Sequence, residues 1–394
     1  MRRRTMMGAA AAGMMAAGAT AAQPGAPAGL DEMLIPALAQ YRMPALAAAV
    51  VRAGRVVAAG AVGTRRHGAS IPVTLNDRFH IGSCTKAMTA MLAGMLVDEG
   101  RLRWDTTIGE GVPDLRQGMD AGLAGVTLAQ LLSHTGGVQP DDDAVMRLIL
   151  EAHGDGTLNL DGMRHDMLAR WRGRPLIAPP GTRFAYANLG YVFAATMIEK
   201  AASSTWEELI STRIFDALRL GTAGIGPQSA MGRIDAPIGH APQPDGALKP
   251  MLAGPNGDVP AVYGPAGAAH LSILDFAAWA GWHAGAGRRA PALVRAPTLA
   301  RMHAKVIDMP PRPDAPTGTP ARGGYGLGWG FLDLPYTGGT VLLHTGSNGM
   351  NLAMILVQPD RDFALVLATN RGGDQADQGL RALQEALYRR FASN

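Results

Sequence analysis

The chain has 394 residues, of which 47% are hydrophobic, so it is long enough to bury a large core. Its formal net charge is +4, but without Arg2, Arg3 and Arg4 the 36 basic residues fall to 33, against 32 acidic ones. This near balance gives no indication of a nucleic-acid partner. The single cysteine, Cys84, excludes a disulfide or a thiolate metal cluster within one chain.

The first residues have the features of an export signal. Three arginines precede a mild apolar stretch at residues 8–19, and Ala19-Thr20-Ala21 offers an A-x-A cleavage site. The order Arg3-Arg4-x-Met6-Met7 is typical of a twin-arginine signal. Residues 1–21 are therefore predicted to direct the protein to the periplasm or out of the cell. No later apolar run reaches the roughly 20 residues of a membrane-spanning helix, so no membrane span is expected.

Apolar segments at both ends of the chain predict one antiparallel sheet of five strands. Amphipathic stretches at residues 31–41 and 377–391 predict helices that cover one face of it. The expected strands are residues 46–52, 56–62, 341–344, 352–357 and 363–369.

These elements predict an α+β fold. Residues 30–84 and 322–394 are expected to form the sheet region, and residues 85–321 an inserted, mainly helical region. The active site is expected in the cleft between the two regions.

Ser83-Cys84-Thr85-Lys86 begins an apolar helix and places a hydroxyl and an amine one helical turn apart. A desolvated, neutral Lys86 can take the Ser83 proton while the serine oxygen attacks a carbonyl. The alternative is a helix-capping serine followed by a solvated lysine. Cys84 is another possible nucleophile, but no adjacent histidine is evident in the sequence to activate it.

Two further motifs follow in the order that this chemistry needs. Of the seven tyrosines, only Tyr186 has an asparagine two residues later, Asn188, in a segment between a Pro/Gly turn and an apolar helix. The phenol can relay protons and the amide can hold a carbonyl or the lysine, although a capped loop with a packed tyrosine is the alternative.

The third motif is His344-Thr345-Gly346-Ser347, which follows one expected strand and precedes another. Gly346 permits a close approach, and the amides of Ser347 and Ser83 can together form an oxyanion hole. A second His-Thr-Gly begins at His134, but it ends a helical run, so His134 is interpreted as structural.

With these three motifs in order, the chain resembles the penicillin-recognising serine hydrolases, specifically class C β-lactamases, D-alanyl-D-alanine carboxypeptidases and family VIII esterases. The resemblance spans nearly the whole chain after the expected signal. It implies that Ser83 is the acylated nucleophile, Lys86 its base and Tyr186 a second proton-transfer group. It also implies substrate-binding roles, which fall on Asn188, His344, Thr345, Gly346, Ser347 and Gln139.

One departure from the family pattern affects the expected substrate. Class C β-lactamases carry lysine where this chain has His344, which is mostly neutral near pH 7. A fixed positive charge for a substrate carboxylate is therefore missing at that position, and this favours uncharged esters or amides.

The predicted function is an exported serine hydrolase that cleaves a small ester or amide through a Ser83 acyl-enzyme. Carboxylesterase activity is favoured, and β-lactamase and D-alanyl-D-alanine peptidase activities remain possible. No cofactor and no metal are expected, since P-loop and H-E-x-x-H motifs are absent from the sequence. The alternative is a non-catalytic member of this fold that binds peptidoglycan fragments or a partner protein.

Overall fold

The computed structural model describes residues 27–154, 159–230, 235–251, 257–310 and 322–392. The export signal predicted at residues 1–21 lies outside these ranges. None of the helices within them is both long and apolar enough to cross a bilayer.

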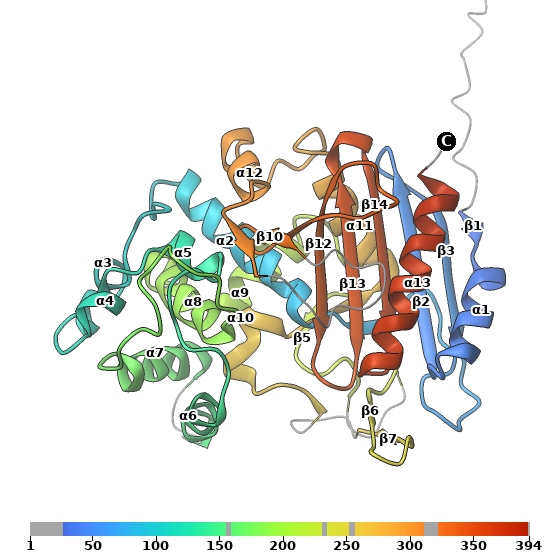
Figure 1. Ribbon diagram of the computed structural model, residues 1–394, viewed down its shortest axis with the longest axis horizontal. Coiled ribbons are helices and arrows are strands. Elements are labelled where there is room, and N and C mark those ends of the chain that lie inside the picture. Colours follow the sequence, from blue (N-terminus) through green and yellow to red (C-terminus); the bar gives the residue numbers. More distant parts are fainter. Residues whose placement is uncertain (1–26, 155–158, 231–234, 252–256, 311–321, 393–394) are drawn as a thin grey trace, which may run out of the picture.

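The main sheet has nine strands, and strands from both ends of the chain lie side by side in it (Figure 1). All neighbours pair antiparallel except β1, which runs parallel to β3. In spatial order the strands are β1 (Ala28–Gly29), β3 (Arg55–Gly63), β2 (Ala45–Arg52), β14 (Phe363–Thr369), β13 (Leu352–Gln358), β12 (Thr340–Ser347), β11 (Gly330–Asp333), β10 (Gly323–Tyr325) and β9 (Ile307–Met309).

The five predicted strands form the contiguous block β3-β2-β14-β13-β12. The prediction of an α+β fold is confirmed, but the five-stranded, purely antiparallel sheet was wrong. The four additional strands are only two to four residues long, and β10 is glycine-rich. Segments this short show no alternation in the sequence, because pairing with longer neighbours determines their conformation.

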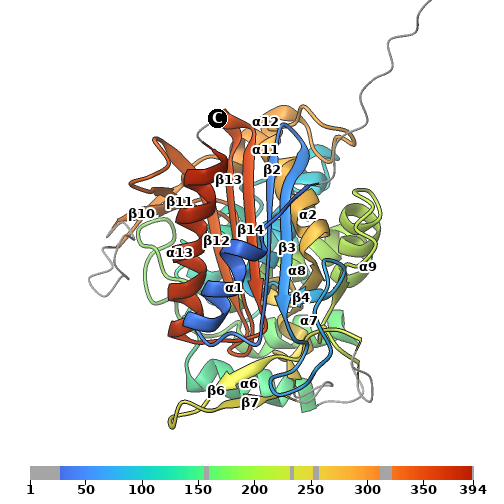
Figure 2. The same ribbon diagram turned by 90° about the vertical axis from the view of Figure 1, so that its right-hand side faces the viewer.

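Both faces of the central strands are buried, and successive residues point into opposite cores. One face packs against α1 (Asp31–Gln40) and α13 (Asp374–Phe391), which lie next to each other over the sheet in Figure 2. The other face packs against α11 (Ile273–Ala284). In β14 the residues that face α1 and α13 are Phe363, Leu365 and Leu367, and those that face the other core are Ala364, Val366 and Ala368.

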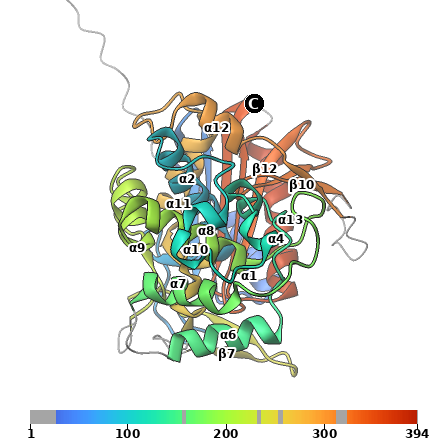
Figure 3. The same ribbon diagram turned by 90° about the vertical axis from the view of Figure 1, so that its left-hand side faces the viewer.

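The rest of the described chain is mainly helical and lies beside the sheet (Figure 3). Residues 85–321 supply these helices, but they also contain β9 and α11, which belong to the sheet and its cover. The helices are α2 (Thr85–Asp98), α3 (Ile108–Gly111), α4 (Ala121–Ala124), α5 (Leu128–Leu132), α6 (Asp143–Gly154), α7 (Leu160–Trp171), α8 (Asn188–Ala202), α9 (Trp206–Ile210), α10 (Gly264–Gly267) and α12 (Ala296–Met302).

Two small sheets complete the fold. In the first, β8 (Ala269–Ser272) pairs with both β4 (Arg78–His80) and β5 (Gly224–Ile225). The second is the hairpin of β6 (His240–Pro242) and β7 (Leu248–Pro250). Strand β4 leads directly into the turn that carries Ser83.

A buried ion pair joins the helices that support α8. The Arg164 side chain on α7 is fully buried and binds Glu199 on α8 and, at 2.8 Å, Glu207 on α9. Glu199 also accepts a 2.8 Å hydrogen bond from the Trp206 amide. Because α8 begins at Asn188, this ion pair helps to fix a helix that carries a candidate site residue.

Replacing Arg164 should therefore cost considerable stability. We expect Arg164→Met to lower the free energy of unfolding by about 3–5 kcal/mol, because it leaves the Glu199 carboxylate buried without its cation. Urea unfolding at pH 7 measures this. The control is Arg103→Ala, which removes exposed ion pairs with Asp105 and Glu110 and should cost less than about 1 kcal/mol. Equal losses in the two variants would contradict the expectation.

Candidate active site

Ser83 lies in a short 3-10 turn, Gly82–Cys84, between β4 and α2. Gly82 has a φ of +50°, which a residue with a side chain adopts only with strain. Thr85 fixes this turn to strand β8, because its hydroxyl donates to Gly82 O at 2.7 Å and accepts from the Ala269 amide at 3.1 Å. The Ser83 hydroxyl thus lies at the positive end of α2.

Lys86 is fully buried, and its Nζ lies 3.0 Å from Ser83 Oγ. The amine donates to Asn188 Oδ1 at 2.6 Å and to Ala266 O at 2.7 Å. A neutral amine has two N–H groups and one lone pair. With both N–H groups directed at these oxygens, the lone pair is free to face the Ser83 hydroxyl.

The electrostatics of the site favour this neutral form. Burial lowers the pKa of Lys86 to about 7, although the Asp141 carboxylate opposes the shift. At neutral pH a substantial fraction of Lys86 is therefore unprotonated and can act as a base.

Tyr186 lies just before α8, close to both Ser83 and Lys86. Its ring centroid is 4.8 Å from Lys86 Nζ. Burial raises the pKa of Tyr186 above its usual range, and a hydrogen bond to Ser83 partly offsets this. The phenol therefore holds its proton at neutral pH and can donate it.

His134, interpreted from the sequence as structural, packs against this tyrosine with their ring centroids 4.2 Å apart. Its Nδ1 accepts a hydrogen bond from the Ala187 amide at 3.2 Å, and burial lowers its pKa well below the usual value. The neutral imidazole supports the Tyr186 segment.

Strand β12 brings the third motif against the Gly82–Cys84 turn, which we call the nucleophile turn because it carries the candidate nucleophile Ser83. A side chain at Gly346 would collide with Ile81 O and with the Ser83 amide, and one at Gly82 would collide with the Ser347 amide. The absence of both side chains places the Ser83 and Ser347 amides close together. Two such donors can stabilise the oxyanion of a tetrahedral intermediate.

His344 is buried and neutral. Its Nδ1 lies 2.9 Å from Thr345 O, and since a carbonyl can only accept, this nitrogen carries the proton. Nε2 then accepts from the Tyr325 hydroxyl at 2.9 Å. Burial lowers the pKa of His344 to about 3, so the imidazole supplies no positive charge to a substrate near neutral pH.

Asp141 is a part of the site that the sequence did not reveal. Its carboxylate accepts from Asn188 Nδ2 at 2.6 Å and from the Tyr263 hydroxyl at 3.3 Å. The predicted Gln139 lies nearby, but its amide donates to Asp142 Oδ2 at 2.8 Å. Asp141 is the first of three aspartates at the start of α6, a pattern that by itself indicates only a helix start.

The contacts of the Cys84 thiol are with backbone carbonyls of β12 and β13. The thiol is buried and lies 3.6 Å from His344 O. Burial raises the pKa of Cys84 far above the usual range, so the thiolate is not accessible at neutral pH. In the part of the chain that the structure describes, no group of three or more His, Cys, Asp or Glu residues could hold a metal ion.

Comparison with known proteins identifies the family. The family model described as Beta-lactamase matches residues 30–389. The chain belongs to this family. Penicillin-binding protein 4 of Amycolatopsis lactamdurans is 27% identical over 330 residues, which cover 79% of this chain and 77% of that protein. The resemblance to the penicillin-recognising serine hydrolases is thus confirmed, and members of the family are generally serine hydrolases.

Solved structures show the same fold. The octameric penicillin-binding protein homologue from Pyrococcus abyssi has a TM-score of 0.73 and 25% identity, covering 91% of this chain and 76% of that one. The D-stereospecific amidohydrolase from Streptomyces sp. has a TM-score of 0.68 and 23% identity, covering 89% of this chain and 96% of that one. The fold is therefore the α+β fold of this family, with the nine-stranded mixed sheet described above.

The Lys86 environment predicts a pH dependence. Protonated Lys86 cannot accept the Ser83 proton, so kcat/KM for an ester should rise with pH through about 7 and level off above it. Stopped-flow or steady-state rates between pH 5.5 and 9 measure this profile.

Two variants make the test specific. Lys86→Met should lower kcat/KM by about 10²–10⁴-fold and abolish the inflection. Asp141→Asn should move the inflection to lower pH, because the carboxylate stabilises the ammonium form. A wild-type profile that is flat across this range would rule out Lys86 as the titrating base.

Proposed function

We propose that the protein is an exported serine hydrolase that cleaves small esters or amides through an acyl-enzyme on Ser83. One observation carries the proposal. A fully buried lysine, whose amine has two other oxygen partners, lies 3.0 Å from the hydroxyl of a serine at a helix start. Export rests on the basic and alanine-rich start at residues 1–21.

The proposed reaction has two halves. First, Ser83 Oγ attacks the substrate carbonyl while its proton passes to Lys86, and the oxyanion is held by the Ser83 and Ser347 amides. Tyr186 then protonates the leaving alcohol or amine, and the acyl group remains as an ester on Ser83. In the second half water attacks this ester and gives a proton to the Tyr186 oxygen, while Lys86 returns its proton to Ser83 Oγ as the acid leaves.

The charges in the site favour esters without a carboxylate. His344 is neutral and uses both ring nitrogens within the protein. Asp141 is exposed and adds a negative charge beside Asn188. Both features disfavour an anionic substrate group, so carboxylesterase activity is favoured over β-lactamase and D-alanyl-D-alanine peptidase activities, although the relatives named above include a penicillin-binding protein.

Asp141 gives a direct test of this selectivity. Two substrates with the same leaving group are compared, p-nitrophenyl butyrate, which is neutral, and mono-p-nitrophenyl succinate, which is anionic. We expect Asp141→Asn to raise the succinate-to-butyrate ratio of kcat/KM about two- to fivefold, because a like charge near the acyl group is removed.

The matched control is Asp142→Asn, since Asp142 is also exposed but contacts Gln139 and the start of α6. Its substrate ratio should stay at the wild-type value. The effect of Asp141→Asn should also shrink in 1 M salt, because exposed charges are screened. An unchanged ratio in Asp141→Asn would contradict the proposed role of this charge.

Covalent labelling tests the function itself. The protein is incubated with a fluorophosphonate or a penicillin, and its intact mass is measured, with Ser83→Ala and Cys84→Ala as controls. We expect an adduct that is lost in Ser83→Ala and retained in Cys84→Ala. Labelling by the fluorophosphonate alone would favour an esterase, a lasting penicilloyl adduct a carboxypeptidase, and rapid penicillin turnover a β-lactamase. The absence of any adduct would favour the non-catalytic binding alternative.

A further inference from the structure

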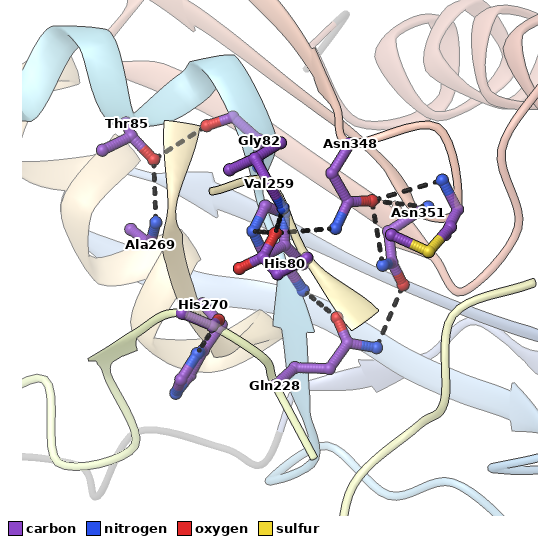
Figure 4. A network of polar contacts seen from close by, with 12 residues as sticks. His80, Gly82, Thr85, Gln228, Val259, Ala269, His270, Asn348 and Asn351 are labelled. Atoms are coloured by element: carbon purple, nitrogen blue, oxygen red, sulfur yellow. Dashed lines mark hydrogen bonds and ion pairs between the residues drawn. The ribbon is translucent and has the colours of Figure 1, made fainter. Parts of the chain in front are cut away.

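A network of polar side chains lies next to Gly82, in the turn that carries Ser83 (Figure 4). We call this set the polar ring. Its members come from segments far apart in the sequence, and four of the five side chains are at most 4% exposed. They are His80, Asp258, Asn348, Asn351 and Gln228.

The contacts close without a break. Asp258 Oδ1 lies 2.8 Å from His80 Nε2 and accepts from Asn348 Nδ2 at 3.0 Å. Asn348 Oδ1 accepts from Asn351 Nδ2 at 3.1 Å, and Asn351 Oδ1 accepts from Gln228 Nε2 at 3.0 Å. Gln228 Oε1 then accepts from the His80 amide at 2.6 Å.

The imidazole of His80 connects this ring to the nucleophile turn. Its Nδ1 accepts the Gly82 amide proton at 3.1 Å, so the proton of a neutral imidazole must be on Nε2. Nε2 faces the Asp258 carboxylate at ion-pair distance. The carboxylate therefore favours the tautomer in which Nδ1 can hold the Gly82 amide.

The polar ring reaches the chain at two places, at Gly82 through His80 and at its own member Asn348, and each place is next to one of the Ser83 and Ser347 amides. Gly82 precedes Ser83, and Asn348 follows Ser347. Between them β12 and the nucleophile turn approach so closely that side chains at Gly82 and Gly346 would collide with backbone atoms. Asp258 contacts both His80 and Asn348.

We propose that His80 and Asp258 are positioning residues that hold the Ser83 and Ser347 amides at the spacing needed to bind an oxyanion. The inference rests on the function proposed above. Neither side chain contacts the substrate or transfers a proton to it. Donors that are preorganised in this way stabilise the transition state without a cost of reorientation during the reaction.

The test compares variants of His80 with a variant of a buried neighbour, His270. His80→Ala removes the acceptor for the Gly82 amide, and His80→Asn restores an acceptor near the position of Nδ1. The control is His270→Ala, because His270 is buried and lies opposite His80 in the β4–β8 pair, but binds Gly226 O at 2.9 Å instead of the polar ring. Asp258→Asn keeps the shape of the side chain and removes its charge, which provides a second variant if His80→Ala does not fold.

Two readouts are measured on each folded variant. The first is kcat and KM for p-nitrophenyl butyrate. We expect kcat to fall about ten- to a hundredfold in His80→Ala and Asp258→Asn with KM within about twofold of wild type, because the loss falls on the transition state. His80→Asn should recover most of kcat, and His270→Ala should stay close to wild type.

The second readout is hydrogen exchange of peptides that cover residues 81–86 and 345–351. Exchange should become faster in His80→Ala and Asp258→Asn, but not in His270→Ala. Equal loss of kcat in His80→Ala and His270→Ala, no recovery in His80→Asn, or unchanged exchange would each overturn the proposal. If wild-type protein neither hydrolyses the ester nor takes a label, the proposed function fails, while hydrogen exchange still decides whether the polar ring holds the two amides.

Discussion

The candidate active site depends on the burial of one amine away from water. Lys86 is fully buried at the start of α2, and burial makes its ammonium form costly enough to lower the pKa to about 7. Asn188 and Ala266 compensate by accepting its N–H groups, so the amine is held in place without being charged. The same contact with Asn188 ties α8 to α2. The buried Lys86 side chain therefore contributes both the candidate base and a contact that joins α2 to α8.

The neutral form of Lys86 is favoured by burial and opposed by the nearby Asp141 carboxylate. His344 stays neutral and adds no positive charge near Lys86. Asp141 is the charged group in contact with Asn188, and it is exposed, so solvent screens it. A substrate carboxylate thus meets no compensating cation at the position of His344. Under the proposed function, substrate choice therefore depends on charge as well as on pocket shape.

The sequence predicted those features that depend on residues close to one another in the chain. Ser83 and Lys86 share a helix face, and the long strands of the sheet show clear apolar runs, so both could be recognised. The contribution of Asp141 could not, because it depends on Asn188 and Tyr263, which are 47 and 122 residues away. Gln139 and Asp141 are two residues apart, and only the path of the loop decides which of them faces Asn188. The short strands β1, β9, β10 and β11 were missed because their neighbours, not their own residues, determine their pairing.

The order of strands has a consequence for how the protein is made. Strand β2 pairs with β14, so Leu46 lies opposite Thr369. During synthesis one edge of β2 stays unpaired until residues 363–369 have emerged, and this strand is rich in alanine and valine. An apolar edge exposed for so long is prone to pair with other chains. Folding is further slowed by the large sequence separation of the pair. The nascent protein is thus exposed to aggregation until β14 has paired with β2.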